Sequence, residues 1–113
     1  GQTLAVRVVD RGSPLPALPA AVEVAAYRIA VEAVTNTSRH SSAREVVTDF
    51  DVLQGALVLT VTDDGPVNGA VAWRPGVGLS SMRERCEQLG GSLEAGPTAA
   101  GGRVRATLPL ANG

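Results

Sequence analysis

The sequence of 113 residues predicts an α/β two-layer sandwich, in which helices pack on one face of a mixed, mostly antiparallel sheet of about five strands. Three observations predict this fold. Five short segments have the composition and alternation of strands. Two other segments carry apolar residues at helical spacing. Short turn sequences join four of the strands into two pairs, which favours antiparallel neighbours. A chain of this length is expected to fold as one domain over residues 1–113.

The N-terminal third is predicted to hold one strand and one long helix. Residues 4–10 alternate as a strand does, and the turn-rich segment 11–16 cannot continue it. After Pro19 the apolar residues change to helical spacing, which predicts a helix that runs to about Arg39. Its apolar stripe comprises Val22, Ala25, Ala26, Ile29, Ala30, Ala33 and Val34.

A hairpin and a long loop are predicted in the middle of the chain. Residues 46–52 alternate, residues 57–62 are mostly apolar, and Gln54-Gly55 between them is a turn sequence. Residues 64–78 are rich in Gly, Pro and Asn and have no periodicity. A loop of this length in so small a domain suggests a lid or a binding segment.

The C-terminal part is predicted to form a second helix and two closing strands. Leu79, Met82, Cys86 and Leu89 have helical spacing, and Gly90-Gly91 ends the helix. Cys86 lies on the apolar side of this helix, so we predict that it is a core residue. The closing strands are predicted at 92–95 and 104–108, with Gly101-Gly102 in the turn between them.

The composition excludes several classes of function. A net charge of -1 and the absence of a basic run argue against nucleic-acid binding. The single cysteine cannot form an internal disulfide. No apolar run approaches the roughly 20 residues that are needed to span a bilayer, and no signal peptide is recognisable. We therefore expect a soluble, cytoplasmic domain. All ten basic residues are arginine, so phosphate-transfer mechanisms that depend on a lysine are excluded.

The end of the first helix carries a candidate metal site. Glu32 and Asn36 stand one turn apart on one helical face, together with Arg28, Thr35 and Arg39. A carboxylate and an amide oxygen suit Mg²⁺, which binds through one or two protein groups plus substrate phosphates. The alternative is an ordinary solvated face opposite the core.

Asp63 is a candidate ligand-binding carboxylate. Alternation places it on the same face as Leu57, Leu59 and Val61, where an unpaired carboxylate would cost several kcal/mol. The exocyclic amine of a purine would supply the missing donor. The alternative is that the strand ends earlier and that Asp63 begins a turn, because Asp-Gly is turn chemistry.

The glycine-rich segment before the second helix is a candidate phosphate site. Gly76 and Gly78 would allow close approach, and the first N–H groups of the helix would face an anion. Ser81 and Glu84 have capping-box spacing, so part of the segment could be ordinary helix initiation. Arg83 and Arg85 could contact phosphate or pair with Glu84 and Glu87 on the outer face.

In this order, the three candidate segments resemble one known family. Glu32-x-x-x-Asn36 resembles an N box and Asp63-Asp64-Gly65 a G1 box, and the segment from Gly76-x-Gly78-Leu79 through Met82 to Arg85 resembles a G2 box. These motifs characterise the ATP-binding catalytic domain of sensor histidine kinases, which has the Bergerat, or GHKL, fold. The strings TNTSRHS, GLSSMRERCEQLGGSLEAGP and GGRVRATLPL resemble the subfamily that pairs with NarL/LuxR-type response regulators, and the resemblance covers nearly the whole chain.

The resemblance implies roles for single residues. Asn36 would coordinate Mg²⁺ on the ATP phosphates, with Glu32 near the metal or polarising the reacting group. Asp63 would accept from the adenine amino group, and Gly65 would let the base approach the backbone. The lid around the phosphates would be shaped by Gly76, Val77, Gly78 and Leu79, while Arg39 and His40 could reach phosphate oxygens. His40 is otherwise a solvated residue that suits a helix C-terminus.

Several positions depart from the family pattern. Val67 stands where the G1 box has its second glycine, Ser81 where a glycine is common, and Arg103 where a threonine is frequent near the base. These departures leave a degenerate nucleotide-binding module as one alternative. A second alternative, of a different functional class, is a switch kinase of the anti-sigma-factor type that phosphorylates serine on a partner, and the segment GLSSMRERCEQLGGSLEAGP argues against it.

The resemblance also implies partners. The chain lacks a separate phosphoacceptor histidine, because His40 lies inside a nucleotide motif. The acceptor would be a histidine on a phosphoacceptor and dimerisation domain outside this chain, so these residues alone should bind ATP, remain monomeric and not autophosphorylate. The expected downstream partner is a NarL/LuxR-type response regulator, with no nucleic-acid or membrane contact.

Overall fold

The computed structural model describes residues 5–10, 18–40, 45–64, 77–98 and 101–110, and within them the side chains of 5–10, 36–40, 77–79 and 97–98 are left undescribed. These ranges contain five strands and two helices. In chain order they are β1 (Ala5–Asp10), α1 (Ala20–His40), β2 (Glu45–Leu53), β3 (Ala56–Asp63), α2 (Val77–Gln88), β4 (Ser92–Thr98) and β5 (Gly101–Pro109).

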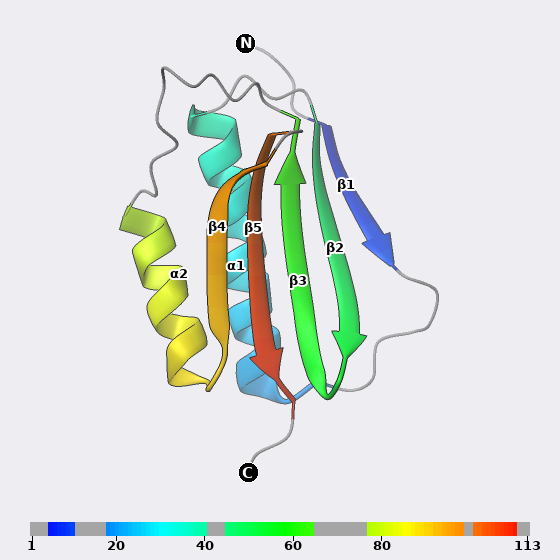
Figure 1. The fold of residues 1–113 in the computed structure, drawn as a ribbon, viewed down its shortest axis with the longest axis vertical. Coiled ribbons are helices and arrows are strands. Elements are labelled where there is room, and N and C mark those ends of the chain that lie inside the picture. The colour runs from blue at the N-terminus through cyan, green and yellow to red at the C-terminus, as the bar shows by residue number, and fades with distance from the viewer. Residues whose placement is uncertain (1–4, 11–17, 41–44, 65–76, 99–100, 111–113) are drawn as a thin grey trace.

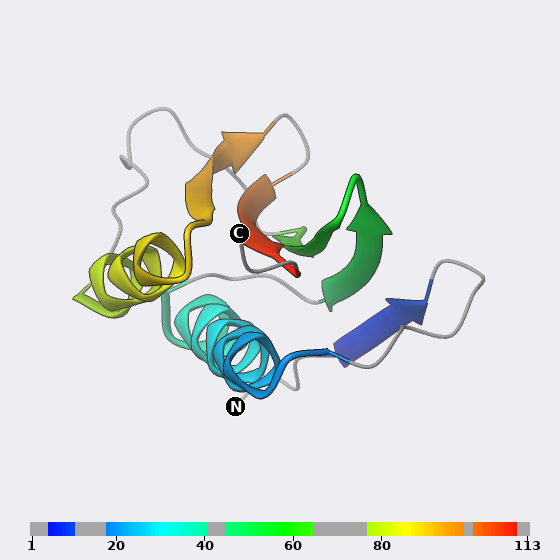
Figure 2. The same cartoon turned by 90° about the horizontal axis from the view of Figure 1, so that it is seen from below.

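The five strands form one mixed sheet with both helices on one of its faces (Figures 1 and 2). The strand order is β1-β2-β3-β5-β4. Only β1 and β2 run parallel, and the other three neighbouring pairs are antiparallel. The predicted two-layer α/β sandwich with a mostly antiparallel sheet is therefore confirmed.

The hairpin between β2 and β3 forms at the predicted turn. Leu53 pairs with Ala56, so the turn consists of Gln54 and Gly55 alone. Both residues have positive φ, 52° and 76° respectively, as a two-residue turn of type I′ requires. The turn fixes the register of the two strands and therefore which of their residues face the helices.

The core lies between the sheet and the two helices. Ile29 of α1 packs among Leu57 and Leu59 of β3 and Leu108 of β5, and all four are fully buried. The predicted apolar stripe of α1 supplies mainly alanines to this core, which lets the helix lie close to the sheet. On β2 the alternation holds as well, because Val46 and Thr48 are buried.

Helix α2 ends at the predicted glycine pair, in a Schellman motif. Gly90 has φ +81°, its N–H donates to the carbonyl of Glu87 at 3.0 Å, and the N–H of Gly91 donates to the carbonyl of Cys86 at 2.8 Å. These two bonds satisfy carbonyls that a helix end leaves open. Glycine at the positive-φ position is therefore the signal that stops α2.

Two predicted boundaries were wrong. Gly101 and Gly102 do not form the turn between β4 and β5, because they belong to β5 and pair with Thr98 and Pro97. Helix α2 begins at Val77, so the C-terminal end of the predicted loop is helical. The rest of that loop, 65–76, lies outside the described residues.

Within the described part of the chain, no helix is long and apolar enough to cross a membrane.

Cys86 provides a test of the packing. The side chain is buried against the core, and this burial, with a smaller contribution from Glu87, raises the pKa of its thiol. Because the thiolate is the reactive form and a raised pKa lowers its fraction at any pH, we expect alkylation at pH 8 to be slower in the folded chain than in denaturant by roughly a hundredfold or more. Rapid labelling of the folded chain would contradict the buried position.

Candidate functional site

The predicted site segments lie at one end of the molecule. The C-terminal end of α1, the last residue of β3 and the first residues of β5 are neighbours at the top of Figure 1, and α2 begins on the same side. The antiparallel pairing of β3 with β5 places Thr62 opposite Arg103, so the end of β3 meets the beginning of β5. The fold therefore brings together segments that are far apart in the sequence.

Asp63 is the last residue of β3 and faces the helix side of the sheet. Strand β3 continues through it, and the buried residues Leu57, Leu59 and Val61 precede it on the same face. The interpretation that the strand ends before Asp63 is therefore wrong. The carboxylate is half-buried, and its Oδ1 accepts the N–H of Gly102 at 3.4 Å.

Gly101 allows the backbone of β5 to lie directly against the end of β3. Its φ is +149°, and a Cβ at this position would stand 2.0 Å from the carbonyl oxygen of Asp63. No side chain fits there, so glycine is required by both conformation and space. Sequence reasoning missed this role, although a glycine pair before an alternating strand is a signal of close backbone approach.

Asp64 ties the end of β3 to the beginning of β2. Its Oδ1 accepts the N–H of Glu45 at 3.0 Å, and its own N–H donates to the carbonyl of Glu45 at 3.3 Å. This double contact holds the backbone that carries Asp63. Asp64 is thus a positioning residue, a role that neither the Asp-Gly turn nor the resemblance to a G1 box had predicted.

Glu32 and Asn36 lie one turn apart near the C-terminal end of α1, as predicted. Glu32 is half-buried, whereas Arg28 one turn earlier is exposed, so this face is not uniformly solvated. The backbone of Asn36, Arg39 and His40 belongs to the last turns of α1, but their side chains are outside the described residues.

The first turn of α2 contains Val77, Gly78 and Leu79, while Gly65 and Gly76 lie outside the described residues. The first four N–H groups of a helix have no intrahelical acceptor, which suits an anion. Because α2 begins four residues before Ser81, Ser81 cannot cap it, and the capping-box interpretation is wrong.

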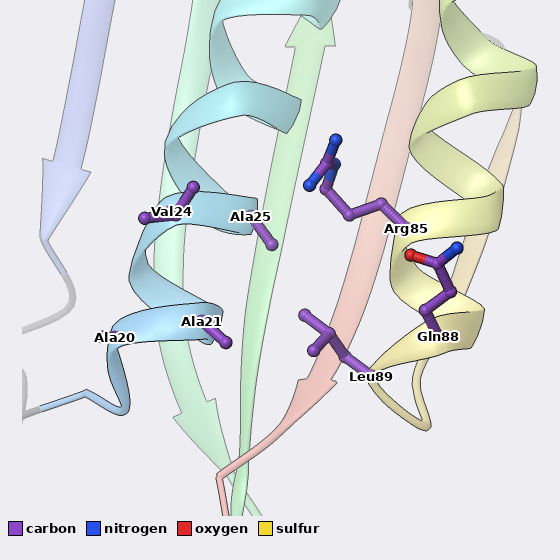
Figure 3. A pocket seen from close by; sticks show the side chains of 7 residues that line it. All are labelled: Ala20, Ala21, Val24, Ala25, Arg85, Gln88 and Leu89. Atoms are coloured by element: carbon purple, nitrogen blue, oxygen red, sulfur yellow. The ribbon is translucent and has the colours of Figure 1, made fainter.

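Arg83 and Arg85 do not support the predicted phosphate contacts. Nε of Arg83 donates to the carbonyl of Leu93 on β4 at 3.4 Å. Arg85 lies in the last turn of α2, about 12 Å along the axis from the helix start, and points toward α1 (Figure 3). Neither guanidinium forms an ion pair with Glu84 or Glu87 in the described part of the chain.

The donor set fits Mg²⁺ held jointly with phosphates. In the described part of the chain, His, Cys, Asp and Glu side chains form no group of three that could enclose a metal. One carboxylate, Glu32, and one amide, Asn36, stand on adjacent turns. A small hard cation that keeps waters and binds substrate phosphates needs no more protein ligands than these.

Comparison with known proteins gives relatives of one kind. No family model matches the chain. It is 37% identical over 93 residues to the sensor histidine kinase YxjM of Bacillus subtilis, covering 81% of this chain and 22% of the relative. It is 35% identical over 105 residues to the nitrate/nitrite sensor protein NarQ of Escherichia coli, covering 91% and 19% respectively. The chain thus spans about a fifth of the length of these relatives.

Solved structures share the fold. The histidine kinase domain of the blue-light activated kinase of Erythrobacter litoralis superposes with a TM-score of 0.72 at 24% identity, over 95% of this chain and 52% of that one. The full-length protein ShkA, solved in complex with AMPPNP, superposes with a TM-score of 0.77 at 21% identity, over 97% of this chain and 26% of that one.

Proposed function

This chain belongs to the sensor histidine kinases as a domain with the fold of their catalytic domains, and from this premise we propose that it binds Mg-ATP at the end of the sheet where Asp63 lies. The γ-phosphate would then be transferred to a histidine on a separate domain. Transfer of this kind relies on positioning and on charge stabilisation more than on covalent chemistry by the protein.

Asp63 is the observation that carries the proposal. Its half-buried carboxylate lies at the end of an apolar strand face, and its Oδ1 accepts the N–H of Gly102. In the proposed complex this carboxylate accepts the 6-amino group of adenine, and the base lies against the helix side of the sheet. Gly65 would let the base approach the backbone.

The phosphates would lie between the end of α1 and the start of α2. Asn36 would hold Mg²⁺, which when bound neutralises charge on the phosphate oxygens. Glu32 would orient or polarise the attacking histidine, and Arg39 and His40 would contact phosphate oxygens. The segment from Gly76 to Leu79 would close over the phosphates and present N–H groups of the first turn of α2.

The partners follow from the chemistry. The acceptor histidine would belong to a phosphoacceptor and dimerisation domain of the same kinase, and these 113 residues alone would remain monomeric. The phosphoryl group would pass to a NarL/LuxR-type response regulator, and the reaction would take place in the cytoplasm, where ATP is present.

Calorimetric titration with AMPPNP, with and without Mg²⁺, tests the proposal. We expect binding that Mg²⁺ strengthens, because the metal would join the phosphates to Asn36. The guanine analogue GMPPNP is the control, since it presents a carbonyl where adenine presents the amino group, and it should bind at least tenfold more weakly. A folded chain that binds neither nucleotide would favour a degenerate module, and phosphorylation of a serine on a partner would favour the anti-sigma-factor type.

Glu32→Gln separates nucleotide binding from transfer. In the full-length kinase we expect the rate of histidine phosphorylation to fall roughly tenfold, equivalent to about 1.4 kcal/mol of activation free energy, because the charge near the reacting group is lost. The Kd of Mg-ATP should change less than threefold. Glu23→Gln, in the exposed first turn of the same helix, is the matched control, and equal losses of rate in both variants would contradict the assigned role.

A further inference from the structure

A groove lies between α1 and α2. It has a volume of about 380 Å³, which is within the size range of small-molecule pockets. Three alanines and Val24 of α1 form one wall, and three longer side chains of α2 form the other: Arg85, Gln88 and Leu89. Because the alanines do not fill the space between the two helices, a hollow remains there (Figure 3).

The groove is apolar at one end and cationic at the other. Ala21 and Leu89 form the lower end in Figure 3, whereas Arg85 extends from α2 toward α1 at the upper end. Helical spacing places Arg28 on the same side of α1, one turn beyond Val24, so it adds a second positive charge near the upper end. The groove therefore has the polarity of an amphiphile with an anionic head.

The donors at the cationic end have no partners within the part of the chain that the structure describes. There the guanidinium groups of Arg28 and Arg85 and the amide of Gln88 form neither a hydrogen bond nor an ion pair. No carboxylate lines the groove. Glu84 and Glu87 lie one and two positions from Arg85, so they project from other sides of α2. An anion in the groove would thus meet two positive charges and no acidic side chain among the lining residues.

We propose that the groove binds a free carboxylate with a single apolar chain, of the class of medium-chain fatty acids. The carboxylate pairs with Arg85 through two parallel N–H···O bonds, the geometry in which arginine binds carboxylates most strongly. The chain lies along the alanines toward Leu89, where each methylene exchanges water for an apolar wall.

The volume of the groove decides between a free fatty acid and a membrane lipid. If each heavy atom takes roughly 30 Å³, the share of one water molecule, 380 Å³ holds about a dozen heavy atoms. This is enough for one chain of medium length with its carboxylate, and it is too little for the two chains and the headgroup of a phospholipid.

The groove is separate from the proposed nucleotide site. It is formed by the beginning of α1 and the end of α2, at the bottom of Figure 1, whereas β3 ends with Asp63 at the opposite end of the sheet. Binding of the carboxylate does not require nucleotide, so the two proposals can fail independently.

NMR titration of the ¹⁵N-labelled chain with octanoate tests the proposal. We expect saturable shifts at the amides of Ala21, Val24 and Leu89. n-Octylammonium has the same chain and the opposite charge, and acetate has the same head and no chain, so each should bind roughly tenfold more weakly or less. Equal binding of octanoate and n-octylammonium, or shifts spread over the whole chain, would overturn the proposal. Sedimentation with phosphatidylglycerol vesicles without binding of octanoate would also overturn it, in favour of a membrane surface.

Two substitutions test the two ends of the groove separately. Arg85→Glu should weaken octanoate binding roughly tenfold or more, because it replaces the cation by an anion. Arg105→Glu, at an exposed position on the helix-free face of the sheet, is the matched control and should leave the Kd unchanged. Ala21→Phe fills the apolar end from an exposed position of α1 and should weaken binding to a similar extent. If a variant with the amide spectrum of a folded chain, either Arg85→Glu or Ala21→Phe, binds octanoate as the parent does, the groove is not the site.

Discussion

Replacing Asp63 by asparagine is expected to weaken the binding of AMPPNP by about a hundredfold or more, which corresponds to roughly 2.7 kcal/mol. The N–H of Gly102 needs an oxygen, so the oxygen of the new amide would face Gly102 and its NH₂ group would face the base. Two donors, the amide NH₂ and the adenine amino group, would then oppose each other. Titration calorimetry of the folded variant measures the loss.

The same geometry predicts that Asp63→Asn changes the nucleotide preference of the chain, which partial unfolding of the variant could not cause. An inosine nucleotide carries a carbonyl where adenosine carries the amino group, so Asp63→Asn should bind the inosine analogue more tightly than AMPPNP. Asp51→Asn is the matched control, because the Asp51 carboxylate also accepts a backbone N–H, from Val52 at 2.9 Å. If both variants bind AMPPNP as the parent does, Asp63 does not contact the base.

The fold could be predicted because its signals are local. Alternation of apolar and polar residues marks the strands, and a stripe at helical spacing marks α1. The turn at Gln54-Gly55 and the stop after α2 both include a glycine with positive φ, Gly55 and Gly90, and glycine is the residue type that signals this conformation. Asp63 could be placed on the inner face of its strand for the same reason, since alternation fixes the face.

The remaining features depend on contacts between distant residues. The glycine pair at 101–102 is compatible with a turn as well as with close backbone approach, and the sequence does not show that the backbone of Asp63, 38 residues earlier, occupies the space of a Cβ at Gly101. The bond between Asp64 and Glu45 joins the ends of two strands in the same way. The groove between α1 and α2 is likewise formed by residues that no sequence pattern brings together.

Gly101→Ala is expected to lower the free energy of unfolding by about 3 kcal/mol or more. At φ +149° a side chain is strained, and its Cβ would stand 2.0 Å from the carbonyl oxygen of Asp63, where rigid backbone cannot give way cheaply. The start of β5 would have to separate from the end of β3, which would also displace the Gly102 N–H from Asp63. Urea unfolding and AMPPNP titration should therefore both change.

Three other glycines separate the causes of this effect. Gly96 has neither positive φ nor a neighbour within 4 Å of its Cβ position, so Gly96→Ala should be nearly neutral. Gly55 has φ +76° but open space, so its alanine variant should lose only about 1 kcal/mol. Gly91→Ala would meet the carbonyl oxygen of Thr107 at 2.0 Å, at the other end of the sheet. Gly91→Ala should destabilise the chain about as much as Gly101→Ala does, but the folded variant should still bind AMPPNP. If both variants lose AMPPNP binding equally, the loss of stability, and not the position of Asp63, controls binding at the site.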